Sequence, residues 1–320
     1  NTSKKEYPIQ ELIEKTRRII IIILLGDLMN NFEVIFTQEP KEERIAKRMA
    51  RSGLCSRRDA ERWILAKRVM VDGIIIDTPA LKVNSKSVII VDGKAIPEKE
   101  EPRLWRYHKP TGQITTTRDV RGRITVFDSL PKDMPRVVSV GRLDYDSEGL
   151  LLLTNDGELA RQLELPSTAW IRRYRVRVYG RPQPNQLDRL SRGVTIDGIK
   201  YGTIDIKLDK QGPSNAWLTI GLREGKNREV RKLMESIELK VMRLIRISFG
   251  PFQLGNLEAG KIEEVKPSSL KEQLGIFSNK PGNFAKAQQR KSSIQKTRNK
   301  TKNADYSGIK PASESHHYQG

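Results

Sequence analysis

Cysteine and histidine are scarce in this chain of 320 residues. The one cysteine, Cys55, excludes an internal disulfide and a thiolate metal cluster. Three histidines do not make a metal site by their number alone. Both shortages suit a reducing cytoplasm and a chemistry without a metal. Since no histidine lies near Cys55 in the sequence, we interpret it as a small buried core residue and not as a nucleophile.

Long apolar runs are missing as well. The apolar run Ile19–Leu25 is far shorter than the roughly 20 residues that span a bilayer, and no small-residue cleavage site follows it. We therefore expect no membrane segment and interpret residues 1–40 as an N-terminal extension; a buried strand or helix at Ile19–Leu25 is the alternative. Met29 is the suspected translation start, which N-terminal sequencing of the native protein tests.

Acidic residues are outnumbered, with 39 Asp and Glu against 59 Lys and Arg and a formal net charge of +20. A polyanion is the natural partner of such a chain, because neutralising phosphates releases condensed counterions. A well-solvated surface without a specific partner is the alternative. Neither a G-x-G-x-x-G loop nor a P-loop is present, so nucleotide-cofactor chemistry has no support and we expect no cofactor.

Residues 42–98 predict a compact module of two basic helices followed by short strands. Apolar spacing in its first part fits one helical face, which comprises Ile45, Met49 and Leu54. Ser56 and Asp59 have the spacing of a capping box at the start of a second helix. Basic residues gather around that helix: Arg57, Arg58, Arg62, Lys67 and Arg68. Clustered basic residues beside a capped helix start suit phosphate contacts, and a solvated helix face is the alternative.

The module resembles the RNA-binding module named after bacterial ribosomal protein S-four. The resemblance rests on four stretches, which are residues 45–46, 50–53, 56–60 and 68–73. It implies that Arg57, Arg58 and Lys67 belong to a face that binds structured RNA.

A charged stretch with two prolines, residues 96–103, is typical of a linker and precedes a second domain at 104–267. Its predicted strands are 114–117, 137–140, 150–154, 174–179, 204–208, 216–222 and 244–249. Its predicted helices are 158–165, 184–191 and 228–236. This pattern favours an α+β domain with a mixed, mainly antiparallel sheet flanked by helices. Residues 271–320 are polar and basic, which indicates a disordered tail that adds weak RNA affinity or only solubility.

Three stretches of the second domain carry candidate chemistry. A polar loop between two predicted strands holds Asp144, Asp146 and Glu148, well placed for chemistry on a bound ligand. In the strand that follows, alternation puts Tyr174 on one face and Arg173, Arg175 and Arg177 on the other. Such a tyrosine can stack on a base while the arginines hold phosphates. The third stretch starts where Gly225 is expected to open a helix, and it contains Lys226, Arg228 and Arg231.

Each of these stretches also has a plainer interpretation. The acidic loop can be solvated, the tyrosine can be a core residue of an amphipathic strand, and the basic residues can line a charged helix start. Asp146 and Glu148 could join Asp144 in a two-carboxylate glycosidase site, but we favour them as loop-structuring or solvated acids.

Together the stretches resemble the ribosomal-RNA pseudouridine synthases, specifically the RsuA/RluB-like branch, which carries the same N-terminal module. The resemblance extends over residues 42–267. The motifs that carry it are residues 107–112, 122–126, 141–144, 147–150, 225–231 and 243–247. The resemblance implies an enzyme that isomerises uridine to pseudouridine without a metal or cofactor.

The same resemblance implies roles for individual residues. Asp144 would be the nucleophile, and Tyr174 would stack on the flipped uracil and assist the loss of its proton at carbon 5. Arg231 would pair with Asp144, with Lys226 as a second candidate for that partner. The substrate-binding residues would include Arg142, Lys226, Arg228 and Ile245, of which Ile245 would form an apolar wall under the base.

The expected substrate is a structured stem-loop of ribosomal RNA, in the large subunit rather than the small, and the expected protein is a cytoplasmic monomer. Two other functions stay open. One is a non-catalytic RNA-binding or ribosome-assembly protein on the same scaffold. The other is an RNA glycosidase, which would release free uracil instead of isomerising it.

Overall fold

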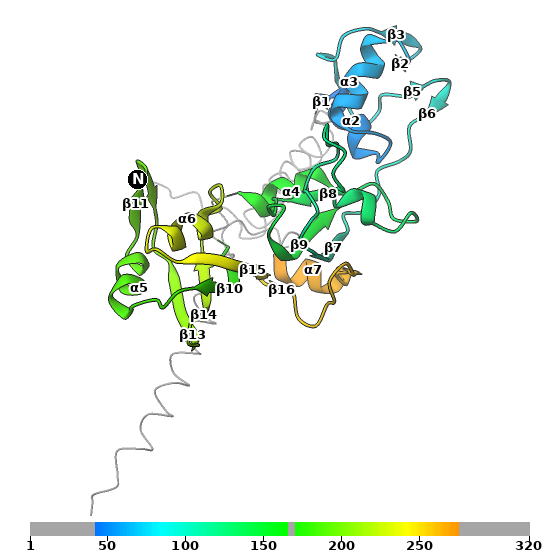
Figure 1. The fold of residues 1–320 in the computed structure, drawn as a ribbon. Helices are drawn as coiled ribbons and strands as arrows, with labels where there is room; N and C mark the ends of the chain where they lie inside the picture. Colours follow the sequence, from blue (N-terminus) through cyan, green and yellow to red (C-terminus); the bar gives the residue numbers. More distant parts are fainter. Residues whose placement is uncertain (1–41, 166–169, 275–320) are drawn as a thin grey trace, which may run out of the picture. The chain divides into compact units, whose positions relative to one another are not determined.

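The computed structural model describes residues 42–165 and 170–274, and Figure 1 shows its ribbon. The chain divides into two compact units, Asn1–Lys99 and Glu100–Gly320. The division falls inside the charged stretch 96–103. The predictions for residues 1–40 and for the tail beyond residue 274 lie outside the described residues.

The first unit is built on two helices and a small antiparallel sheet. Its elements are β1 (Glu43–Arg44), α2 (Ile45–Arg51), α3 (Arg57–Leu65), β2 (Val69–Val71), β3 (Ile74–Ile76), β4 (Lys82–Val83), β5 (Ile89–Val91) and β6 (Lys94–Ala95). The larger sheet has the order β3-β2-β5-β6, and β1 pairs with β4. The two helices and these strands share one apolar core, which includes Ile45, Met49, Ala60, Ile64 and Val69.

The start of α3 follows from its capping box. The hydroxyl of Ser56 accepts a hydrogen bond from the backbone N–H of Asp59 at 3.0 Å, and the carboxylate of Asp59 accepts one from the backbone N–H of Ser56 at 3.3 Å. The predicted capping box is confirmed, and Cys55 is buried as expected. The position of Leu54 was predicted wrongly, because α2 ends at Arg51 and Leu54 is exposed.

The second unit is built on one nine-stranded sheet. Its elements are β7 (Leu104–Lys109), η1 (Phe127–Ser129), β8 (Val138–Val140), β9 (Glu148–Thr154), α4 (Gly157–Glu164), β10 (Arg172–Tyr179), α5 (Pro184–Ser191), β11 (Val194–Ile196), β12 (Ile199–Tyr201), β13 (Asp205–Gln211), β14 (Asn215–Leu222), α6 (Glu229–Glu235), β15 (Lys240–Phe249), β16 (Phe252–Gln253), β17 (Ile262–Glu264) and α7 (Pro267–Leu274). The sheet has the order β13-β14-β10-β15-β9-β7-β17, with β8 on β9 and β16 on β15. Most pairs are antiparallel and β15 with β9 is parallel, which confirms the predicted α+β class.

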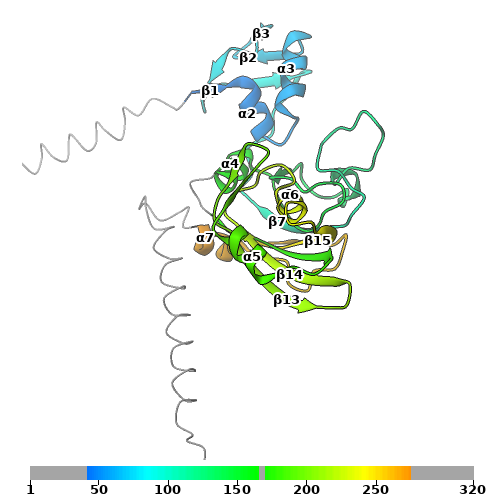
Figure 2. The same cartoon turned by 60° about the vertical axis from the view of Figure 1, so that its left-hand side comes forward.

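Side chains on the two faces of this sheet belong to different apolar clusters. Helices α5 and α6 pack on the part formed by β13, β14, β10 and β15 (Figures 1 and 2). We call the apolar layer beneath them the α6 cluster, and it includes Val176, Leu218, Val230 and Leu233. On β9 and β7, the Trp105 cluster includes Tyr107, Leu143, Leu151 and Leu153. The Leu150 cluster lies on the other face of β9 and includes Leu152, Leu163 of α4 and Leu270 of α7.

The predicted element boundaries differ from the structure in several places. Helix α5 has the predicted bounds, and α6 lies within the predicted helix 228–236, although the helix does not open at Gly225. A strand at 114–117 was predicted wrongly, because Ile114 forms a single isolated bridge with Thr125. Helix α7 continues to Leu274 and buries Leu270, so ordered structure extends past residue 271, where the sequence predicted a tail.

Gly149 lies where the parallel strands β9 and β15 meet. The pairs in this ladder are Ile245 with Glu148 and Arg246 with Gly149. Gly149 has φ +106°, and a Cβ atom there would be 2.4 Å from the backbone oxygen of Arg246. The two backbones can approach this closely because glycine has no side chain.

Candidate active site

Asp144 lies in the loop between β8 and β9, and backbone hydrogen bonds fix that loop on both sides. The N–H of Gly112 donates to the carbonyl of Tyr145 at 2.8 Å. The hydroxyl of Thr115 donates to the carbonyl of Leu143 at 2.9 Å, and Leu143 is buried. Asp144 itself is half-buried, and its carboxylate forms no ion pair with the basic residues that the structure describes. The carboxylate is therefore available to a ligand on a loop whose backbone is held in place.

Lys109 holds the Asp144 loop in place through hydrogen bonds to its backbone. It is the last residue of β7 and is fully buried. Its ammonium donates to three backbone carbonyls, those of Pro110 at 3.0 Å, Asp144 at 3.0 Å and Ser147 at 2.8 Å. Burial lowers the pKa of Lys109 to about 8, against the raising effect of the nearby negative charges of Asp144 and Asp146. The sequence analysis included Lys109 in a motif but gave it no role.

We expect Lys109→Met to destabilise the protein by about 2–3 kcal/mol at pH 7, because one buried and two partly buried carbonyls lose their donor. The hydrogen bonds of the lysine go to backbone carbonyls and not to the carboxylate of Asp144, so the loss of activity at low temperature should be within about tenfold. The folded protein binds fewer protons than the unfolded chain between pH 8 and 10.5, so the wild type should gain stability relative to the variant over that range.

Urea unfolding of both proteins at pH 7 and pH 9.5 measures these effects, with the exposed Lys132→Met as the control. A variant as stable as the wild type but without activity would instead place Lys109 in the chemistry.

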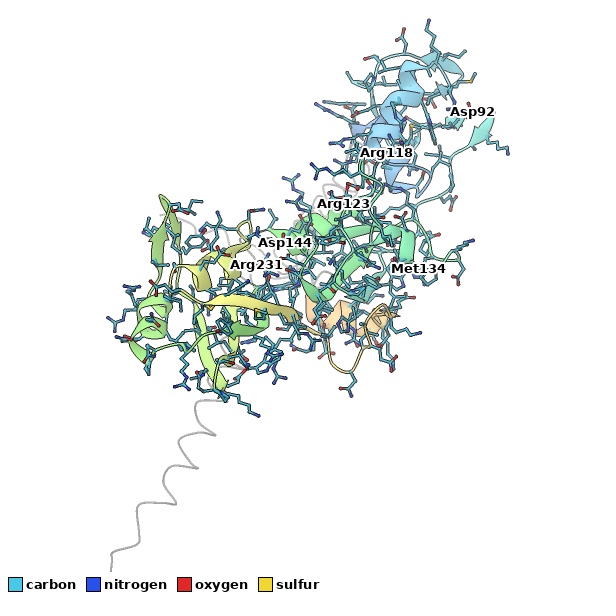
Figure 3. All side chains as sticks on the ribbon, in the orientation of Figure 1. Asp92, Arg118, Arg123, Met134, Asp144 and Arg231 are labelled. Carbon is cyan, nitrogen blue, oxygen red and sulfur yellow. The ribbon has the colours of Figure 1, made fainter. Side chains whose placement is uncertain are left out.

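Tyr174 lies on β10 next to the Asp144 loop. Its strand alternates as predicted, with Val176 and Val178 buried and the arginines between them exposed. The tyrosine is partly buried and packs against both the α6 cluster and the Trp105 cluster. The first contains Val230, the neighbour of Arg231, and the second contains Leu143, the neighbour of Asp144. The packing therefore brings three candidate residues from three elements into one region; Asp144 and Arg231 are labelled in Figure 3.

The arginines of β10 do not share this region. Arg173, Arg175 and Arg177 lie on the face of the strand opposite to Tyr174, and β10 is an inner strand between β14 and β15. They cannot reach around a sheet edge to hold the phosphates of a nucleotide stacked on Tyr174. The expectation that one nucleotide contacts both Tyr174 and these arginines is therefore not met, because the sheet separates them.

Arg231 pairs with a different carboxylate from the one expected. Its guanidinium is buried and lies 3.0 Å from the carboxylate of Asp146, and it also donates to the carbonyl of Asp146 at 2.9 Å. Arg228 lies 3.4 Å from the same carboxylate. The predicted pairing of Arg231 with Asp144 is therefore not present, because the guanidinium forms its ion pair with Asp146 instead. Asp146 has the loop-structuring role that the sequence favoured, since it ties the Asp144 loop to α6.

Lys226 does not pair with Asp144 either. Its ammonium forms an ion pair with Glu224, donates to the carbonyl of Lys200 at 2.6 Å and lies 5.2 Å from the centre of the Tyr201 ring. The backbone N–H of Lys226 donates to the carboxylate of Glu229 at 2.9 Å. Burial raises the pKa of Glu229 to about 7, and the neighbouring charge of Glu224 adds to that effect. Lys226, Glu224 and Glu229 thus hold in place the segment that leads into α6.

We expect Glu229→Gln to make stability less dependent on pH. The raised pKa means that Glu229 contributes stability below about pH 4.5, and that this contribution is lost as pH rises through about 7. The variant should therefore gain about 1–2 kcal/mol relative to the wild type between pH 5 and pH 8. Urea unfolding at the two pH values measures the change, and the exposed Glu235→Gln is the control. Equal pH profiles for wild type and variant would contradict the raised pKa.

Ile245, expected as an apolar wall under the base, does not lie on the same face of the sheet as Tyr174. In the ladder between β10 and β15, Tyr174 lies opposite Arg246 and Arg175 lies opposite Ile245. Ile245 therefore lies on the other face from Tyr174, where it packs against the Leu150 cluster. Arg246 takes the place beside Tyr174, is buried, and donates from Nε to the carbonyl of Leu150 at 2.7 Å.

The remaining candidate residues are exposed basic side chains. Arg142 lies on the Asp144 loop. In the first unit, Arg57 and Arg58 occupy the first turn of α3, and Lys67 follows the helix with φ +57°. Arg57 and Arg58 thus lie at the start of α3 and Lys67 beyond its end, and their expected place in an RNA-binding face stays a prediction.

A search of the described residues finds no group of three or more His, Cys, Asp or Glu side chains that could hold a metal ion. Within the same residues, no helix has the length and apolar character needed to cross a membrane.

Comparison with known proteins gives two family matches along the chain. Residues 43–89 match the S4 domain, and residues 103–236 match the family described as RNA pseudouridylate synthase. A crystal structure of a pseudouridylate synthase superposes with a TM-score of 0.53 at 21% identity, over 72% of this chain and 99% of that one. The last likeness concerns the fold alone.

Curated relatives match over both units. A protein of Rickettsia felis named as an uncharacterized RNA pseudouridine synthase is 49% identical over 228 residues, which cover 71% of this chain and 99% of that protein. The ribosomal large subunit pseudouridine synthase B of Haemophilus influenzae is 39% identical, over 75% of this chain and 71% of that protein. The protein of the same name from Salmonella typhi is 42% identical, over 66% of this chain and 75% of that protein. The chain contains both matched domains, and it is 49% identical to the Rickettsia felis protein over 71% of its own length. The chain therefore belongs to the RNA pseudouridine synthase family.

Proposed function

We propose that this enzyme isomerises one or a few uridines of ribosomal RNA to pseudouridine, with Asp144 as the nucleophile. The observation that carries the proposal is the half-buried carboxylate of Asp144, held on an anchored loop beside Tyr174. The S4 domain supports an RNA substrate. The relatives named for the large ribosomal subunit support that RNA over the small-subunit RNA.

The reaction exchanges one bond for another without a change in mass. The bond between ribose carbon 1′ and uracil N1 breaks, and a bond between carbon 1′ and uracil carbon 5 forms. The proton at carbon 5 leaves, and N1 gains a proton. The carboxylate of Asp144 attacks the sugar or the ring in the first step and is released at the end, as in other covalent catalysis.

The target nucleotide must leave its stack before Asp144 can reach it, at a cost of a few kcal/mol. Tyr174 offers an aromatic ring that can stack on the flipped uracil, and its hydroxyl can assist the loss of the proton at carbon 5. Arg231 and Arg228 hold Asp146 and so set the shape of the loop that carries Asp144. In this arrangement Arg231 is a positioning residue that acts through Asp146.

Carbodiimide labelling of ribosomal RNA incubated with the full-length enzyme tests the proposal. We expect labelled pseudouridine at one or a few positions and no release of free uracil. Release of uracil would identify an RNA glycosidase, and RNA binding without either product would identify a non-catalytic assembly protein. Mapping pseudouridine in cells with and without the gene then gives the target and distinguishes the two subunits.

A further inference from the structure

The exposed face of β10 and its neighbouring strands forms a basic surface in the catalytic unit. We call it the arginine face, and it comprises Arg173, Arg175 and Arg177 of β10, Trp217 and Thr219 of β14, and Lys207 of β13. Arg177 lies opposite Trp217, Arg175 opposite Thr219, and Lys207 on the other side of Thr219. These residues share one face because directly paired residues of antiparallel strands point the same way.

The three arginines have the geometry of a ligand-binding row. They are exposed and spaced two residues apart, which is about 7 Å along a strand. None of them forms an ion pair with a carboxylate in the described part of the chain. The guanidinium of Arg175 lies 4.8 Å from the centre of the Trp217 ring, so the indole fixes its position. The planar guanidinium groups can therefore each present a pair of donors to a phosphate.

The positive charges on this face repel one another when no anion is bound. Arg177 lies directly opposite Arg243 in the ladder, and like charges in such a pair destabilise a sheet. Glu148 pairs with Arg243 at 2.5 Å, and Asp209, which accepts a hydrogen bond from Thr219 at 2.6 Å, forms no ion pair with the three arginines in the described residues. A polyanion would relieve the repulsion. The chain's own residues beyond 274 have the wrong charge for this role, because Lys and Arg outnumber Asp and Glu there.

We propose that the arginine face binds phosphates of the substrate RNA at a distance from the target uridine. Resting on the proposed function, this inference adds a second contact region on the sheet face opposite to Tyr174. The partner is RNA because the face combines a basic row with a half-exposed aromatic ring, the combination that tracks a nucleic-acid backbone. Because this face lies opposite to Tyr174, we expect a longer RNA with flanking helices to contact it and a minimal stem-loop in the catalytic site not to do so.

The test compares the affinity of Arg175→Gln/Arg177→Gln and of the wild type for two RNAs. One is the minimal stem-loop around the mapped uridine, and the other is the longer ribosomal fragment that contains it. We expect the variant to lose about tenfold more affinity for the long RNA than for the short one. The logarithm of the association constant for the long RNA decreases linearly with the logarithm of the salt concentration, and the steepness of this decrease should be smaller by about 1.5 in the variant.

The matched control is Arg189→Gln/Arg192→Gln at the C-terminal end of α5, where Arg192 pairs with Asp188; it removes the same charge on the helix-covered side of the sheet. It should change the ratio of the two affinities by less than about twofold. Arg175→Lys/Arg177→Lys keeps the charge but loses the paired guanidinium donors, so its long-RNA affinity should lie between those of the wild type and the Gln variant, with the salt dependence of the wild type. Urea unfolding of all three proteins checks that the variants are folded. Equal losses in the Gln variant and the control, or unchanged long-RNA binding, would overturn the inference. Absence of pseudouridine in both RNAs would contradict the proposed function instead, since binding is measured separately.

Discussion

Asp144→Asn should lower the rate of pseudouridine formation by about 10⁴-fold or more, which is the scale of losing an essential nucleophile. Asparagine has nearly the same shape as aspartate but no carboxylate. The contact that anchors this residue runs from Lys109 to its backbone carbonyl and survives the substitution. RNA affinity should therefore stay within severalfold of the wild type, as measured by filter binding beside the carbodiimide assay.

Asp146→Asn is the matched comparison for this variant, because the structure pairs Arg231 with Asp146. It keeps the nucleophile and weakens only the tie between the loop and α6, so we expect a loss of about tenfold. If Asp146→Asn were inactive and Asp144→Asn active, the nucleophile would be Asp146. If both variants made pseudouridine at near the normal rate, carboxylate catalysis from this loop would be ruled out.

Gly149→Ala should be the most destabilising single methyl addition in the catalytic unit, by about 3 kcal/mol or more. The added Cβ would lie 2.4 Å from the oxygen and 2.6 Å from the nitrogen of Arg246, both of them backbone atoms that cannot rotate away. The backbone at Gly149 also has φ +106°, which alanine rarely adopts.

Gly157→Ala is the control for that variant, because Gly157 begins α4 and has no atom within 4 Å of an added Cβ. It should change stability by less than about 0.5 kcal/mol or raise it slightly. Urea unfolding gives both values. Equal stability of the two variants would mean that β9 and β15 can separate at little cost.

Local patterns of the sequence were enough to predict the class of fold and many of its elements. Alternation along β10 identified the buried and exposed faces, and the spacing of Ser56 and Asp59 identified the start of α3. These features depend on neighbouring residues, so a single sequence contains them. The same holds for the Asp144 loop, which a buried strand follows directly.

The errors concern contacts between residues that are distant in the sequence. The pairing of β10 with β15 shifts register between Arg173 and Tyr174, and no local pattern fixes which residue of β15 then lies beside Tyr174. The sequence therefore did not show that Ile245 and Tyr174 lie on opposite faces of the sheet. Likewise, Arg231 meets Asp146 because α6 starts after Arg228, which has φ +50°. Lys109 was given no role because two of its acceptors, Asp144 and Ser147, lie far along the chain.

The parallel contact between β9 and β15 makes the catalytic unit a pair of half-sheets joined along a seam. Two ladder pairs cross this seam, together with the side chains of Arg231, Arg243 and Arg246. The proposed nucleophile belongs to one half, and the proposed stacking tyrosine belongs to the other. A uridine bound between Asp144 and Tyr174 would therefore contact both halves and add a link across the seam.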